Sequence, residues 1–379
     1  MTRRVSRWGA ACLVLPLAVW VSGCSLFGGD TPKPKELQAL TSAGTARLLW
    51  SSRVGSVEFP LAVAASGDRF TVADSSGTVV ALRAQDGGEL WRAQVGDKLA
   101  AGVGSDGRFA AVVTRNQELV VIEAGQVLWR KAMKSPVMTS PLVAGERVFV
   151  QAVDRSVHAF DAQDGRKLWE LARPGDALLL AHPGGLIPYK DTLVVGQGPR
   201  LAGVDPLRGT MRWEANLANP RGTNEVERLA DVVGPLVRVG DLICGRAFQS
   251  AVGCLSAARG SLVWNRQNAG SVGVGASPEL VVGSDALSRL TAWRTTNGES
   301  LWTSDEFERR QLTAPLVVGK GVWVGDFQGY MHWLDTATGK AQARLQAGSS
   351  PIVTAPVALA DGTVVVVGKD GGVHALRSD

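Results

Sequence analysis

The segment SVHAFDAQDGRKLW, residues 156–169, contains the pattern that decides the fold. Its first half alternates along the chain with a period of two, which is typical of a half-buried β-strand. A turn that ends in Gly165 follows, and a second strand leads to Trp169. We expect the glycine to adopt a positive φ in this turn. The segment therefore predicts two neighbouring antiparallel strands, the second of which carries a tryptophan.

Tryptophan recurs at this position at intervals of 38 to 51 residues. The series consists of Trp50, Trp91, Trp129, Trp169, Trp213, Trp264 and Trp302. Six of these seven residues follow a glycine by four positions, and Gly339 extends the series to Ala343, where the tryptophan is missing. A repeat of this length in a β-rich chain indicates a propeller, in which a large flat side chain can pack between neighbouring blades.

Two further strands complete each repeat, and the count gives eight repeats. The first strand opens with a proline, as in residues 140–143, where no ladder donor is needed. After Ala343, residues 351–376 supply three strands and no fourth, whereas residues 46–54 form a fourth strand with no partners before it. The N-terminal strand can thus complete the last blade and close the ring. We predict an all-β, eight-bladed propeller of four-stranded blades over residues 45–379.

Residues 1–23 have the features of a secretory signal peptide. Three arginines come first, residues 9–20 are almost wholly apolar, and small residues precede Cys24. The apolar run is too short to span a bilayer comfortably, which argues against a transmembrane anchor. Its removal takes away three arginines and no acidic residue, so the formal net charge falls from +5 to +2. Nothing that remains indicates a nucleic-acid partner, and we expect residues 24–44 to be a polar tether.

Two cysteines, Cys244 and Cys254, remain in the predicted propeller. Residues 242–255 are predicted to form a hairpin that turns near Gln249, which would place the two sulfurs opposite each other on adjacent strands. Two interpretations stay open, a disulfide, which an oxidising compartment favours, and a pair of buried free thiols. We expect no metal here, because no histidine or acidic cluster accompanies the pair.

The histidines and acidic residues do not form a recognisable active site. His158 and His332 share one repeat position and His374 has a matching context, so we interpret these three as structural. His182 lies in an irregular loop, where we expect it to be exposed. Most carboxylates are expected to accept backbone N–H groups in turns. The sequence has no Gly-x-Ser-x-Gly motif, zinc-spaced histidine pair or phosphate-binding loop, and we expect no catalytic residue, cofactor or metal site.

Two stretches depart from the repeat. Residues 173–188 include three leucines, at 178–180, outside the usual strand pattern, and residues 219–231 are an insertion. Function is commonly located in irregular loops on a regular scaffold. Exposed leucines beside charged residues would form an apolar patch with a polar rim, which is the anatomy of a partner site. The alternative is that these leucines pack inside the blade.

The unit Ala-x-Asp-x-x-x-Gly-x-x-x-Trp, as in residues 159–169, resembles the PQQ-like repeat of quinoprotein dehydrogenases. The resemblance implies an eight-bladed propeller and, in those enzymes, pyrroloquinoline quinone and a calcium ion near the axis. This chain is much shorter than their catalytic domains and lacks the adjacent Cys-Cys pair that many of them carry. No set of Glu, Asn and Asp can be assigned to calcium. A periplasmic PQQ-dependent dehydrogenase-like enzyme is therefore the second hypothesis.

Over its whole length the chain more closely resembles the BamB family, the lipoproteins of the outer-membrane β-barrel assembly machinery. The resemblance rests on residues 221–231 (RGTNEVERLAD), 310–315 (RQLTAP) and 324–335 (VGDFQGYMHWLD), and on residues 21–24, which resemble a bacterial lipobox. It implies cleavage before Cys24, lipidation of that cysteine and sorting to the outer membrane, since no aspartate follows it. The lipid would hold the protein at the periplasmic face.

The BamB resemblance also implies a non-catalytic scaffold that binds the periplasmic POTRA domains of BamA, the barrel subunit, and helps to hand over unfolded outer-membrane proteins. The contact residues that the resemblance carries over are Leu178, Leu180, Ala181, Glu227, Arg228, Leu229 and Asp231. In the family, Ala181 is often arginine and Val233 is often a second acid, so we expect the apolar contact to be kept and the charged contact to be weaker. A third hypothesis is a lipoprotein propeller with another envelope partner.

Overall fold

The computed structural model describes residues 32–40, 45–59, 61–172, 182–220 and 229–378, together with the single residues 2, 180 and 224. Two compact units divide the chain, Met1–Lys33 and Pro34–Asp379, and every strand belongs to the second. In the described part, no helix is long and apolar enough to cross a membrane. Residues 3–31, which hold Cys24 and nearly all of the predicted signal peptide, lie outside the described residues.

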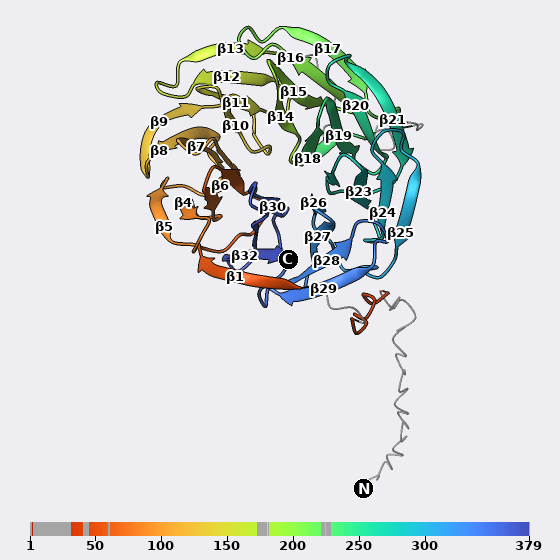
Figure 1. The fold of residues 1–379 in the computed structure, drawn as a ribbon. Coiled ribbons are helices and arrows are strands. Elements are labelled where there is room, and N and C mark those ends of the chain that lie inside the picture. The colour runs from red at the N-terminus through yellow and green to blue at the C-terminus, as the bar shows by residue number, and fades with distance from the viewer. Residues whose placement is uncertain are drawn as a thin grey trace. The chain divides into compact units, whose positions relative to one another are not determined.

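The second unit is a ring of eight antiparallel sheets of four strands each, which we number as blades 1 to 8 (Figure 1). The first four blades consist of β2 (Ala64–Ser66), β3 (Arg69–Ala73), β4 (Thr78–Arg83) and β5 (Glu89–Gln94); β6 (Leu99–Ser105), β7 (Phe109–Thr114), β8 (Glu118–Glu123) and β9 (Gln126–Ala132); β10 (Leu142–Ala144), β11 (Arg147–Gln151), β12 (Val157–Asp161) and β13 (Lys167–Leu171); and β14 (Leu186–Tyr189), β15 (Thr192–Gln197), β16 (Arg200–Val204) and β17 (Met211–Asn216).

The other four blades have the same strand order. They consist of β18 (Val232–Val239), β19 (Leu242–Ala247), β20 (Ala251–Ser256) and β21 (Ser261–Gln267); β22 (Val274–Ala276), β23 (Leu280–Ser284), β24 (Leu290–Arg294) and β25 (Ser300–Ser304); β26 (Leu316–Val318), β27 (Gly321–Gly325), β28 (Tyr330–Asp335) and β29 (Ala341–Gln346); and β30 (Val357–Ala358), β31 (Val364–Val367), β32 (Gly372–Ser378) and β1 (Ala46–Arg53). The first strand of each blade lies innermost and the fourth outermost (Figure 1).

Blade 8 closes the ring as the sequence predicts. Its fourth strand is β1, which pairs antiparallel with β32 from Ala46 opposite Ser378 to Arg53 opposite Gly372. The two ends of the propeller therefore lie in one sheet. Both the eight-bladed fold and the closure by the N-terminal strand are confirmed.

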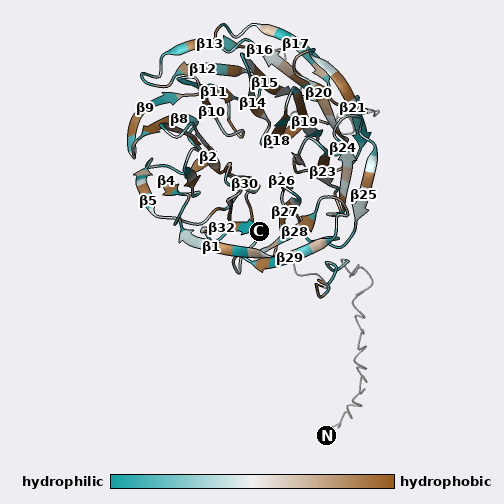
Figure 2. Ribbon diagram, in the orientation of Figure 1, coloured by the Kyte–Doolittle hydropathy of each residue, from teal (hydrophilic) through white to brown (hydrophobic). Residues whose placement is uncertain are grey.

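The composition of the strands explains the layers of each blade. Second and third strands are buried along most of their length, and β7 (FAAVVT) and β20 (AVGCLS) at every position, because neighbouring blades cover both of their faces. Fourth strands lie at the rim and mix charged with apolar residues, as in β9 (QVLWRKA), which is mostly exposed. Figure 2 shows this contrast between hydrophobic inner strands and mixed outer strands.

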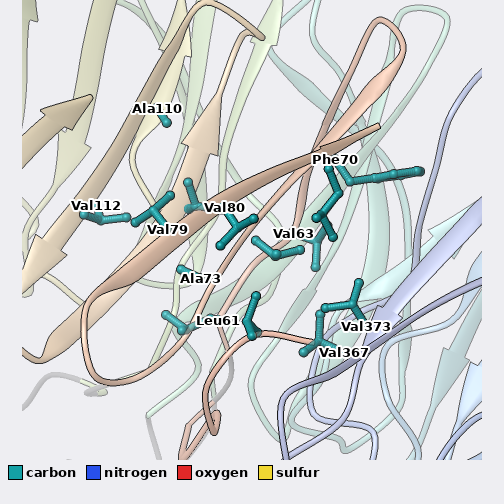
Figure 3. Close-up of a cluster of buried hydrophobic side chains, with 14 of the residues drawn as sticks. Leu61, Val63, Phe70, Ala73, Val79, Val80, Ala110, Val112, Val367 and Val373 are labelled. Carbon is teal, nitrogen blue, oxygen red and sulfur yellow. The ribbon is translucent and has the colours of Figure 1, made fainter. Parts of the chain in front are cut away.

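The hydrophobic core lies between blades, in the way that propellers distribute it. One cluster joins blade 8 (Val367, Val373), blade 1 (Phe70, Val79) and blade 2 (Val112), and all five side chains are almost fully buried (Figure 3). Each such side chain contributes about 1.5 to 3 kcal/mol relative to exposure. Adjacent blades thus stabilise one another through contacts that repeat around the ring.

The periodic tryptophans and glycines form the outer part of these contacts. Each tryptophan packs on the glycine of the next blade, not on the glycine four residues before it. A Cβ added to Gly298 would lie 2.5 Å from the Trp264 ring, so only glycine fits there. The pairs are Trp50–Gly87, Trp91–Gly125, Trp129–Gly165, Trp169–Gly209, Trp213–Gly260, Trp264–Gly298 and Trp302–Gly339. These glycines have φ between 62° and 83°, which confirms the predicted positive φ.

Hydrogen bonds reinforce the same junctions. In five of the seven pairs the indole N–H also donates to a backbone carbonyl of the next blade; for Trp264 the acceptor is the Thr295 carbonyl at 2.7 Å. This geometry explains the alanine at position 343. A tryptophan there would face blade 8, whose third and fourth strands come from opposite ends of the chain and have no joining turn. The glycine-bearing turn that a tryptophan requires is missing at this junction.

The ring has two faces with different loops. Because successive strands in a blade run antiparallel, the turn between its second and third strands emerges on the same face as the connector to the next blade. We call this the connector face. Turns between first and second strands, and between third and fourth strands, lie on the opposite face.

The N-terminal segment of the propeller unit lies against the connector between blades 6 and 7. The Lys35 N–H donates to the Glu308 carbonyl at 3.0 Å, and its Nζ lies 3.0 Å from a carboxylate oxygen of Asp305. Leu37 packs on the core cluster that contains Phe307. Residues 35–37 are thus docked on the propeller.

The hairpin predicted around the cysteines is present in blade 5. β19 pairs with β20 so that Cys244 lies directly opposite Cys254, and the structure joins them by a disulfide. Both sulfurs are buried, against Trp264 among others. The disulfide therefore links the second and third strands of the blade that follows the irregular insertion.

Candidate functional site

Three of the four histidines lie at one structural position, in the third strands of blades 3, 7 and 8. His158, His332 and His374 each pair with a valine of the second strand and are buried. Burial lowers the pKa of each imidazole below its ordinary value. Each ring has a hydrogen-bond partner within its own blade, for example Ser51 Oγ at 3.0 Å from His374 Nδ1. These contacts agree with a structural role.

The turn carboxylates act on the backbone, as predicted. Asp161, Asp205 and Asp335 each accept backbone N–H groups within their own turns. Among the described residues, no three His, Cys, Asp or Glu side chains gather as a metal would require.

One buried charged cluster lies on the connector face of blade 7. Arg310 donates from Nε and Nη2 to Asp326 Oδ2 at 2.9 and 2.7 Å, and His332 Nε2 lies 3.0 Å from the same oxygen. Burial alone would raise the pKa of Asp326, but the hydrogen bonds from His332 and Arg310 lower it overall. The guanidinium also donates to the Lys35 carbonyl at 3.2 Å. The cluster therefore joins the N-terminal segment to the ring.

The two irregular stretches of the sequence are neighbouring connectors on the connector face. One joins β13 to β14 and contains Leu180, and the other joins β17 to β18 and contains Leu229 and Asp231. Of the other predicted contact residues, Leu178, Ala181, Glu227 and Arg228 lie outside the described residues. Leu180 and Leu229 are half-buried, so each keeps part of its surface in solvent.

Asp231 joins the two connectors. Its Oδ2 accepts the backbone N–H of Leu180 at 2.9 Å, and its Oδ1 lies 2.9 Å from Nη2 of Arg155. The carboxylate is only 16 % exposed and the guanidinium side chain 15 %. The structure thus brings together Leu180 and Asp231, which the sequence assigned to one surface without predicting their contact.

His182 lies beside this contact and is half-buried, so the prediction of an exposed side chain is wrong. Its ring centroid lies 6.4 Å from that of Phe248, and its backbone N–H donates to the Leu180 carbonyl at 2.9 Å.

Arg155 is the residue that sequence reasoning missed. It lies in the turn between β11 and β12, a regular part of blade 3, and has a positive φ of 64°. One feature of the sequence could have indicated Arg155, namely an arginine at a turn position where glycine is common. Three of the six turns that have a positive φ at this position have glycine there, and an arginine is a costly choice for a left-handed backbone conformation.

Comparison with known proteins places this architecture in one family. The family model described as "Outer membrane protein assembly factor BamB" matches residues 33–98 and 75–304. The chain is 32% identical to the outer membrane protein assembly factor BamB of Bordetella pertussis, over 99% of this chain and 100% of that protein. It is 30% identical to the BamB of Burkholderia pseudomallei, over 98% of this chain and 99% of that protein.

A solved structure shows the same fold. The crystal structure of BamB from Moraxella catarrhalis superposes with a TM-score of 0.79, and the match covers 88% of this chain and 100% of that one. The two chains are 20% identical, so this likeness concerns the fold alone.

Proposed function

Since this chain belongs to the family of the outer membrane protein assembly factor BamB, we propose that it is a non-catalytic scaffold of the β-barrel assembly machinery. In this proposal it binds the POTRA domains of BamA and aids the insertion of β-barrel proteins into the outer membrane. The observation that carries the proposal is the full-length relationship, which includes the irregular connectors as well as the repeats.

The proposed location follows from the N-terminal sequence. We expect cleavage before Cys24 and lipidation of its thiol, which would hold the propeller at the periplasmic face of the outer membrane. Replacement of Cys24 by alanine should release the protein from washed membranes into the soluble fraction. Retention of the Cys24→Ala protein in membranes, with no lipid on the wild-type residue by mass spectrometry, would contradict this location.

The connector face supplies the proposed contact with BamA. Leu180 and Leu229 offer apolar surface, and Asp231 with Arg155 forms a polar border beside them. An apolar centre with a polar rim fits a protein partner better than a small polar ligand. We propose that Leu178, Ala181, Glu227 and Arg228, from the same two connectors, belong to this surface.

Co-purification tests the proposal. The tagged, full-length chain should capture BamA from detergent-solubilised membranes, and Leu180→Asp or Asp231→Arg should weaken that capture without unfolding the propeller. Leu262→Asp is the control, because Leu262 is an exposed leucine on the outer strand of blade 5. Unchanged capture by both connector variants would remove the surface assignment, and capture of other envelope proteins without BamA would favour the third hypothesis.

The enzyme hypothesis has its own test. The purified chain, mixed with pyrroloquinoline quinone and calcium, should show no bound chromophore after gel filtration. A stoichiometric chromophore would support a dehydrogenase-like activity instead of the scaffold.

A further inference from the structure

We propose that Arg155 is a positioning residue of the partner surface: through Asp231 it fixes both irregular connectors and so sets the position of Leu180. The inference rests on the proposed function, because it concerns the same surface. It adds a residue from a third loop, in a regular turn of blade 3, that the family resemblance does not assign to binding.

The contacts of Asp231 give the first step. One carboxylate oxygen lies 2.9 Å from Arg155 Nη2, and the other accepts the Leu180 N–H at 2.9 Å. Both oxygens are therefore held within the molecule, and the side chain is 16 % exposed. Such a carboxylate acts first on its own connectors, since it links the segment before β14 to the segment before β18.

The surroundings of the guanidinium give the second step. It lies over Gly198, in the turn between β15 and β16, where an added Cβ would be 3.1 Å from Arg155 Cζ. The Gly198 carbonyl accepts the Val232 N–H at 2.7 Å, and the Arg155 carbonyl accepts the Gln197 side chain at 3.1 Å. Arg155 thus contacts the turn of blade 4 and, through Asp231, the connector that enters blade 5.

The backbone of Arg155 gives the third step. In six of the eight turns between second and third strands, the residue at this position has a positive φ: Gly77, Gln117, Arg155, Ser288, Gly329 and Gly371. In blades 4 and 5 the positive φ comes one residue earlier, at Gly198 and Gln249. Glycine adopts this conformation without strain, whereas arginine does so at a cost. The turn itself has no need of a guanidinium, so the side chain is explained by what it contacts across the connector face.

These observations separate positioning from stability. An ion pair that is partly open to solvent contributes little to stability, and a change to glycine relieves the backbone strain. Arg155→Gly should therefore leave the thermal midpoint within about 2 °C of wild type. The connectors, however, lose the group that holds the Asp231 carboxylate in place.

The experiment measures the connectors and the partner separately. We use the full-length lipoprotein in detergent, purified BamA as the probe, and hydrogen exchange at the Leu180 amide. In Arg155→Gly we expect faster exchange at that amide and about tenfold weaker binding to BamA. Gln117→Gly, the same change in the equivalent turn of blade 2, should alter neither. Arg155→Lys, which keeps the charge but not the planar fork, should recover part of both.

The outcomes distinguish the two proposals. Failure of the wild-type chain to bind BamA would overturn the proposed function, and the role of Arg155 with it. If the wild-type chain binds BamA and Arg155→Gly binds it equally well, only the role of Arg155 is overturned. Unchanged exchange at Leu180 alongside weaker binding would also overturn it, since Arg155 would then contact the partner directly instead of positioning the connector.

Discussion

The outer rim and the connector face of this propeller use opposite means to join blades. At the rim, seven tryptophans pack on the glycines of the following blades, and each junction repeats the same apolar contact. On the connector face, Arg155 and Asp231 join loops of three successive blades through a partly exposed charged contact. The rim contact is periodic and apolar, whereas the connector contact is made by charged side chains.

This difference separates stability from surface shape. Burial of an indole ring removes much apolar area from water, so the rim should account for much of the stability. A partly exposed ion pair contributes about 0 to 1 kcal/mol, so the connector contact should account for little. The pair instead fixes where Leu180 lies, because Asp231 accepts the Leu180 N–H.

The largest expected effect comes from breaking one rim contact. Trp264→Ala removes a side chain that is 5% exposed and its hydrogen bond to the Thr295 carbonyl. We expect a loss of about 3 to 5 kcal/mol, seen as a lower midpoint of urea unfolding. Leu262→Ala, two residues away and 40% exposed, is the control and should change little. Equal effects of the two variants would refute the division between rim and surface.

The second effect tests a charged contact, Arg310–Asp326, that is more deeply buried than Arg155–Asp231. Asp326→Ala leaves Arg310, whose side chain is 4% exposed, without a carboxylate. We expect a loss of about 3 kcal/mol, at the lower end for a broken buried pair, because Arg310 keeps the Gln328 side chain and the Lys35 carbonyl as partners. The urea midpoint measures it, with Arg155→Gly as the less deeply buried counterpart. A smaller loss in Asp326→Ala than in Arg155→Gly would contradict the role given to burial.

The third effect concerns blade 5, which the connector enters. Replacement of Cys244 and Cys254 by alanine removes a disulfide between residues that are 10 positions apart in the sequence. The loss of this constraint on the unfolded chain should lower the free energy of unfolding by about 2 kcal/mol. Thermal unfolding with and without reductant measures it, since reductant should lower the midpoint of the wild type and leave the double variant unchanged. If complete reduction of the disulfide leaves the thermal midpoint of the wild type unchanged, the prediction is contradicted.

The smallest effect is the dependence of stability on pH. Burial lowers the pKa of His158, His332 and His374 in the fold, so the unfolded chain binds more protons once the pH falls below about 6.5. This contribution to stability is therefore full above that pH and is lost progressively as the pH falls below it. Rim tryptophans do not titrate. We expect His374→Gln to reduce the slope of the thermal midpoint against pH, and an unchanged slope would count against this origin.

The sequence predicted the frame because its signal is periodic. The spacing of tryptophans and the unpaired strand before the first repeat were enough for eight blades and their closure, and both are confirmed. The partner of each tryptophan was not predictable, since the period gives positions along the chain and not across a junction. Arg155 and Asp231 lie 76 residues apart in different blades, so no local pattern connects them. A contact that does not repeat along the chain can be identified only from the structure.

The pairing of β1 with β32 also determines the order in which the chain can fold. Ala46 pairs with Ser378, so the first strand synthesised has to wait for the last. Blades 1 to 7 each consist of four consecutive strands and can form in sequence, whereas blade 8 requires the two ends of the chain to meet. Until they meet, β1 and β32 present unpaired edges that can bind other strands. Ring closure is thus a late, non-local step of the kind that slows folding, and truncation at either end leaves the same open blade.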